Sequence, residues 1–154
     1  MMGIAVLLHV LAVVVWVGGM FFAYMVLRPV AAGQLEPPAR LTLWAGVFAR
    51  FFPWVFAAIA VILATGLWMV YAVYGGFSAT GLYINLMFWL GLVMMLIFFH
   101  VFFAPYRRLR AAVAQEDWPT GGSKLAQIRM LVGINTLLGL VVIAIGAGGR
   151  FLLN

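Results

Sequence analysis

Four long apolar stretches leave this sequence few architectures to adopt: Ile4–Leu27, Phe51–Val73, Leu82–Ala104 and Met130–Gly149. A helix that crosses the hydrocarbon core of a bilayer needs about 20 mostly apolar residues, and each stretch satisfies this requirement. Only 8% of the residues are charged and 68% are hydrophobic, so a water-soluble fold could not enclose the apolar surface. The sequence therefore predicts an all-α integral membrane protein, with residues 1–154 forming one bundle of four transmembrane helices.

The segments between these stretches contain the glycine and proline residues that are typical of connections, and they are Arg28–Arg50, Tyr74–Gly81 and Pro105–Arg129. Pro53 is expected near the start of the second helix, where its missing N–H does no harm. Within the third connection, residues 106–118 are expected to form a short helix that lies along the membrane surface.

The basic residues predict the orientation of the bundle. Eight of the nine fall in the first and third connections, and only Arg150 falls on the opposite side of the membrane. Because Lys and Arg accumulate in cytoplasmic loops, both termini are expected outside and these two connections in the cytoplasm. The net charge of +6 is thus explained by topology and by attraction to anionic headgroups, and no nucleic-acid partner is expected.

One face of the fourth helix carries small or polar residues at a helical period: Asn135, Gly139, Val142, Gly146 and Gly149. Small residues allow a neighbouring helix to approach closely, and an asparagine can donate a hydrogen bond across the contact. This face is therefore predicted to pack against other helices.

Two histidines, His9 and His100, lie within the apolar stretches. Ionisable residues inside a membrane are functional candidates, although a hydrogen bond between helices is an equally reasonable role for a neutral histidine. The two histidines differ by about 20 Å in depth at about 1.5 Å of rise per residue. They are therefore not expected to bind one haem iron within a single chain.

Counting depth along the helices groups the histidines with methionines in two layers. The outer layer contains His9, Met69 and Met87, and the inner layer contains Met20, Met25 and His100. Imidazole and thioether groups are ligands for Cu(I), and His/Met ligation also suits a b-type haem. The alternative is that these methionines only fill gaps in an apolar core.

On the first helix, His9, Val13, Trp16 and Met20 share one face, which is expected to look into the bundle. Trp16 could form the wall of a haem site or simply pack. No acid lies within an apolar stretch and the chain has no cysteine, so the usual catalytic pairs are missing. If the protein were an enzyme, a bound cofactor would have to supply the chemistry, and the sequence leans against an enzyme.

The first helix, LHVLAVVVWVGGMFF, and the second, RFFPWVFAAIAVILATGLW, resemble those of the copper-resistance D (CopD)-like membrane proteins. The features that carry the resemblance are His9 followed by Trp16, Arg50–Phe51 at the entrance of the second helix, and Thr65–Gly66 near its exit. The resemblance implies copper handling or copper transport in the bacterial inner membrane. Because larger members have more helices, transport by this chain would require a homo-oligomer.

The same His-to-Trp spacing resembles the HemJ-type protoporphyrinogen oxidases, in which His9 would bind haem. Those proteins follow with a Pro-Arg pair, whereas this chain has Arg28–Pro29 in reversed order. Three functions therefore remain open. They are a copper-handling membrane protein, a haem b oxidoreductase, and a small structural subunit of a larger membrane complex.

Overall fold

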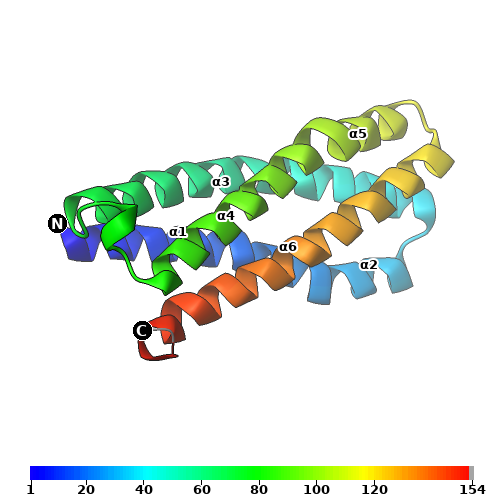
Figure 1. Ribbon diagram of the computed structural model, residues 1–154. Coiled ribbons are helices and arrows are strands. Elements are labelled where there is room, and N and C mark those ends of the chain that lie inside the picture. Colours follow the sequence, from blue (N-terminus) through cyan, green and yellow to red (C-terminus); the bar gives the residue numbers. More distant parts are fainter. Residues whose placement is uncertain (153–154) are drawn as a thin grey trace.

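The computed structural model describes residues 1–152, apart from the side chains of Arg150 and Leu152, and these residues form helices and short connections. Four helices are long and apolar enough to cross a membrane: Met2–Gln34, Pro37–Ala72, Leu82–Ala114 and Trp118–Gly149. They lie side by side as an elongated bundle (Figure 1). The predicted four-helix membrane architecture is confirmed.

The first and third spans each contain a wider, π-helical turn beside a proline. The first span consists of α1 (Met2–Phe21), the π-helical η1 (Phe22–Leu27) and α2 (Arg28–Gln34). The third consists of α4 (Leu82–Val101), the π-helical η3 (Phe102–Tyr106) and α5 (Arg107–Ala114). Pro29 follows η1 and Pro105 lies in η3. Proline has no N–H and its ring crowds the preceding turn, and a wider turn lets the helix continue past it.

The other two spans are single helices, α3 (Pro37–Ala72) and α6 (Trp118–Leu152). A short 3₁₀ helix, η2 (Phe77–Ala79), lies in the connection between α3 and α4. Pro53 stands inside α3 rather than in its first turn. The expectation for Pro53 was wrong because α3 begins sixteen residues earlier, at Pro37.

The helices extend well beyond the apolar stretches 4–27, 51–73, 82–104 and 130–149, and two expected connections shrink to residues 35–36 and 115–117. The apolar length measures only the part of a helix that lies in hydrocarbon, whereas backbone hydrogen bonds continue into the polar flanks. The expected surface helix over residues 106–118 was also wrong. Residues 106–114 continue the third span and residues 115–117 form a turn, and Leu109 and Ala112 are buried close to Gly121 of α6.

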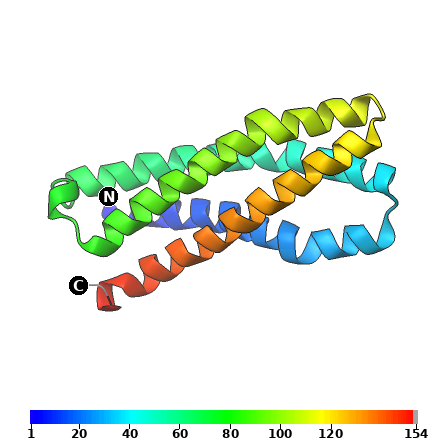
Figure 2. The ribbon, with the colours of Figure 1, turned by 45° about the vertical axis from the view of Figure 1, so that its right-hand side comes forward.

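The two termini and the α3–α4 connection lie at one end of the bundle, and the other two turns lie at the opposite end (Figures 1 and 2). The closest backbone pairings are α1 with α3 and α4 with α6, while α6 also contacts α1 and α3. The first and third turns share one end, and most of the basic residues of the chain lie in the helix segments next to these turns. We call this the basic end.

Large aromatic side chains fill the space between α3 and the third span. They repeat every four residues on both helices: Trp44, Phe48, Phe52 and Phe56 on one, and Phe98, Phe102 and Tyr106 on the other. The ring centroids of Phe52 and Tyr106 are 4.8 Å apart, and those of Phe56 and Phe102 are 4.9 Å apart, both edge to face. This geometry suits the quadrupoles of the rings and holds the two backbones apart.

The small-residue face of α6 makes close contacts, as predicted. A Cβ atom added at Gly139 would lie 2.9 Å from Val17 Cγ2 and 3.1 Å from Met94 Cε, so three helices meet there. The Asn135 side chain is buried, and its Nδ2 donates to the Met94 carbonyl over 3.2 Å. These contacts are the close helix approach that small residues permit in membranes.

Candidate functional site

His9 forms a hydrogen bond from the first span to α3. Its Nδ1 lies 2.8 Å from Thr65 Oγ1, and the Thr65 hydroxyl donates over 2.6 Å to the Val61 carbonyl. The imidazole is half-buried, and the Ile62 carbonyl also interacts with it. His9 therefore faces the neighbouring helix, as expected for a histidine that cannot be satisfied by lipid.

The hydrogen bonds of Thr65 favour one tautomer of His9. A threonine hydroxyl carries one proton, and its shortest hydrogen bond is the one to the Val61 carbonyl. In the tautomer that suits this arrangement, Thr65 Oγ1 accepts from His9 Nδ1–H and Nε2 keeps its lone pair. A histidine whose second nitrogen is held by a hydrogen bond in this way is oriented to bind a metal ion.

The backbone of α3 leaves room for this imidazole. A Cβ atom added at Gly66 would lie 3.3 Å from His9 Cε1, which is tighter than ordinary side-chain contact. Met69 follows Thr65 by one helical turn on the same face of α3, and it is half-buried. The structure thus places His9 and Thr65 at the interface between α1 and α3, with Met69 one turn farther along the same face of α3.

Met87 lies at a different interface. Its sulfur is 2.9 Å from the position of a Cβ atom at Gly146, so Met87 packs α4 against α6. The contacts described for His9 and for Met87 share no residue. Of the predicted outer layer, His9 and Met69 belong to one helix pair and Met87 belongs to the other.

The inner layer does not come together within one chain. Met20 is buried, but Met25 is 55% exposed and His100 is also exposed. His100 shares the outward face of α4 with Leu96, one turn before it. In the part of the chain that the structure describes, no three His, Asp or Glu side chains are grouped as a metal site.

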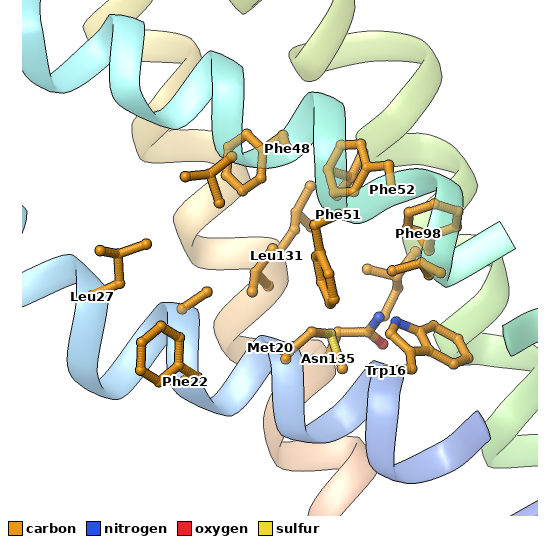
Figure 3. A pocket seen from close by; sticks show the side chains of 17 residues that line it. Trp16, Met20, Phe22, Leu27, Phe48, Phe51, Phe52, Phe98, Leu131 and Asn135 are labelled. Carbon is orange, nitrogen blue, oxygen red and sulfur yellow. The ribbon is translucent and has the colours of Figure 1, made fainter. Parts of the chain in front are cut away.

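The face of α1 that bears Trp16 borders an apolar cavity of about 330 Å³ inside the bundle. Figure 3 shows aromatic rings of Phe48, Phe52 and Phe98 on one side of this cavity, and Met20 and Phe22 of the first span on the other. The Trp16 and Phe98 rings meet edge to face, with centroids 6.3 Å apart. Trp16 and Met20 point inward as predicted, although His9 does not line the cavity.

One polar group faces this apolar cavity. Asn135 of α6 lines it together with Trp16. The amide nitrogen of Asn135 donates to the Met94 carbonyl, but Oδ1 has no hydrogen-bond partner among the described residues. An unpaired buried oxygen is costly, and among the described side chains Asn135 Oδ1 is the buried polar atom that is left without a partner.

A second hollow of about 350 Å³ opens at the basic end, and we call it the arginine groove. Its walls come from the first span, α3 and α6, and three of its residues are Arg28, Arg40 and Arg129. Sequence reasoning did not find this group, because the three arginines are far apart in the chain and only the turns between helices bring them together.

Sequence reasoning also missed Thr65 and the aromatic ladder, by which we mean the aromatic side chains that repeat every four residues on α3 and on the third span. The ladder has a signal in the sequence, namely aromatic residues at every fourth position of two helices. Thr65 was noted only as part of a family resemblance. Its partnership with His9 depends on the relative depth of two helices, which the sequence does not specify.

A family model described as copper resistance protein D matches residues 45–148. The match includes most of α3, all of the third span and most of α6, with Thr65, Met69, Met87 and His100 among its residues. No curated protein and no solved structure matches the chain. Since the matched segment is more than half of the sequence and runs through three of the four membrane-crossing helices, the chain belongs to the copper resistance protein D family.

Proposed function

We propose that this protein handles copper in the bacterial inner membrane, with Cu(I) bound through His9 Nε2 near the end of the bundle that holds the termini. The single observation that supports this most is the hydrogen-bond chain from His9 through Thr65 to Val61. It presents a neutral imidazole with its lone pair on Nε2, which is the form that binds a metal.

Met69 is the proposed second ligand. It stands one turn from Thr65 on the same face of α3, and a thioether is a soft ligand that favours Cu(I). Met87 and His100 are proposed to contribute only if copper passes between two copies of the chain, because Met87 packs on α6 and His100 faces outward. In this arrangement copper is cargo and the protein is not an enzyme.

The packing of the interior supports binding by one chain more than passage through it. The space between α3 and the third span is filled by the aromatic ladder, and the central cavity is lined almost entirely by apolar side chains. A desolvated metal ion crossing there would meet few ligands. We therefore propose that any transfer across the bilayer takes place at an interface within a homo-oligomer.

The experiment is a Cu(I) titration of the purified protein in mild detergent against a chromophoric chelator. The His9→Ala variant should lose the site. The Thr65→Val variant keeps the imidazole but removes its partner, and it should bind about 10- to 100-fold more weakly. Met69→Leu should also weaken binding. His100→Ala removes an exposed histidine. Unchanged affinity in this variant would place the site within one chain, whereas a loss would place it between two copies.

The same samples distinguish the other functions. If the wild type binds no more copper than His9→Ala, the copper proposal is wrong. A visible haem spectrum that disappears in His9→Ala would assign the imidazole to haem b instead. Co-purification with a larger complex, with neither copper nor haem bound, would support a structural subunit.

A further inference from the structure

The arginine groove collects positive charge, and no acid is among its lining residues. Arg28, Arg40 and Arg129 reach it from three different helices. None of the three acids of the chain lines the groove, and none of these arginines forms an ion pair with a described residue. Three neighbouring guanidinium groups repel one another, so an anion between them would stabilise the arrangement.

Two of the arginines are held in place. The Arg28 guanidinium lies over the Tyr24 ring, with its central carbon 4.6 Å from the ring centroid. Arg40 extends from α3 and donates to the Ala32 carbonyl of α2 over 3.5 Å. Trp44 and Trp118 also line the groove, and such aromatic residues favour the headgroup level of a membrane. A positioned guanidinium suits the oxygens of a phosphate group.

The arginine groove adjoins the apolar cavity. Three residues line both: Ala23 of the first span, Phe48 of α3 and Val132 of α6. The cavity also reaches the lipid-facing surface, because Phe22 lines it and is 55% exposed. The two spaces thus lie side by side as a composite hollow with a basic mouth and an apolar interior. An inorganic anion would use only the mouth, whereas an amphiphile would use both parts.

We propose that this hollow binds one anionic phospholipid, with its phosphate among Arg28, Arg40 and Arg129 and one acyl chain in the apolar cavity. Basic pockets between transmembrane helices hold anionic lipid headgroups in this way. The site is separate from His9, which lines neither part of the hollow. A lipid bound there would contact the first span, α3 and α6, so the packing of these three helices would depend on the lipid composition of the membrane.

Native mass spectrometry of the protein in mild detergent, with added phosphatidylglycerol or phosphatidylcholine, tests this proposal. We expect one retained phosphatidylglycerol per chain and much weaker retention of phosphatidylcholine. The triple variant Arg28→Gln, Arg40→Gln, Arg129→Gln should bind phosphatidylglycerol on the order of 100-fold more weakly, since each arginine near an anionic surface contributes about 1 kcal/mol.

A second triple variant provides a matched control. Arg107→Gln, Arg108→Gln and Arg110→Gln remove the same charge from exposed positions of α5 that do not line the groove, so retention should be unchanged. Equal losses of phosphatidylglycerol retention in the two triple variants would overturn the proposal, because binding would then depend only on the net charge of the protein. Equal retention of the two lipids would also overturn it.

The chain length of the lipid tests the apolar half of the site. Ala23→Phe places a large side chain at the junction of groove and cavity, so it should weaken long-chain phosphatidylglycerol more than a short-chain form. Inorganic phosphate should not displace the lipid at equal concentration. If phosphate alone competes as well as the lipid, the groove is an anion site and the cavity plays no part.

Discussion

A single threonine makes a membrane-embedded histidine possible in this bundle. Thr65 donates to its own helix at Val61 and pairs with His9 Nδ1, so the hydroxyl and Nδ1 are satisfied without water and Nε2 stays available. A valine at position 65 has nearly the same shape but would leave Nδ1 without that acceptor. The functional assignment of His9 therefore depends on its partner as much as on the histidine itself.

Asp117 gives a prediction at the basic end, where water reaches the chain. Its Oδ1 accepts from the Thr120 N–H over 3.2 Å at the start of α6, which satisfies one free N–H of the first turn. The hydrogen bonds of Asp117 with the Thr120 side chain and backbone lower the pKa of this exposed carboxyl below its ordinary value of 3.8. The stabilisation is therefore present above pH 3.8 and is lost as the pH falls through the lower, folded-state pKa.

Hydrogen exchange at the Thr120 amide measures this cap. Asp117→Ala should raise the exchange rate at neutral pH, whereas Asp117→Asn should keep protection because asparagine is an equally good cap. Equal exchange in the wild type and in Asp117→Ala would show that the hydrogen bond does not protect the first turn. The effect should be confined to the start of α6.

The helices illustrate how far an apolar pattern determines a membrane fold. The apolar pattern predicted four spans and the inward face of α1, because polar groups that face lipid find no hydrogen-bond partner. It did not predict the helix ends. At Pro29 and Pro105 the chain was expected to leave the helix, but a π-helical segment adjoins or contains each proline and the helix continues. The arginine groove could not be predicted, since it needs the packing of three helices.

The small-residue face of α6 gives a prediction at the level of elements. Gly139→Leu should destabilise the bundle by about 1–3 kcal/mol, because the new side chain would overlap Val17 and Met94. Unfolding in a titration with a denaturing detergent measures this change. Gly18→Leu is the control, since Gly18 lies in the same bundle with nothing within 4 Å of an added Cβ atom.

Similar losses of stability in Gly139→Leu and Gly18→Leu would mean that replacing a glycine in either helix destabilises the bundle, whether or not a neighbouring helix lies close to it. A loss confined to Gly139→Leu would place the energetic contact where α1, α4 and α6 meet. The result also bears on the sequence pattern. The comparison shows whether small residues on one face of α6 make a packing contact between helices or are small without such a contact.

The whole molecule has its charge at one end and its proposed copper ligand toward the other. The His9 site lies on the half of α1 nearer the termini, whereas the arginine groove lies beside the short turns at the basic end. If positive charge marks the cytoplasmic side, copper would meet His9 from outside the cell and the lipid site would face the cytoplasm. The orientation of the bundle therefore decides the direction of any copper transfer.

The chain has no cysteine, so single cysteines report this orientation without interference. Gly33 in α2 is exposed at the basic end, and Ser78 is exposed in the connection between α3 and α4 at the other end. In intact cells, an impermeant thiol reagent should label Ser78→Cys and not Gly33→Cys. Both should be labelled once the cells are opened, which controls for accessibility of the thiols. Labelling of Gly33→Cys alone in intact cells would reverse the orientation, and His9 would then accept copper from the cytoplasm.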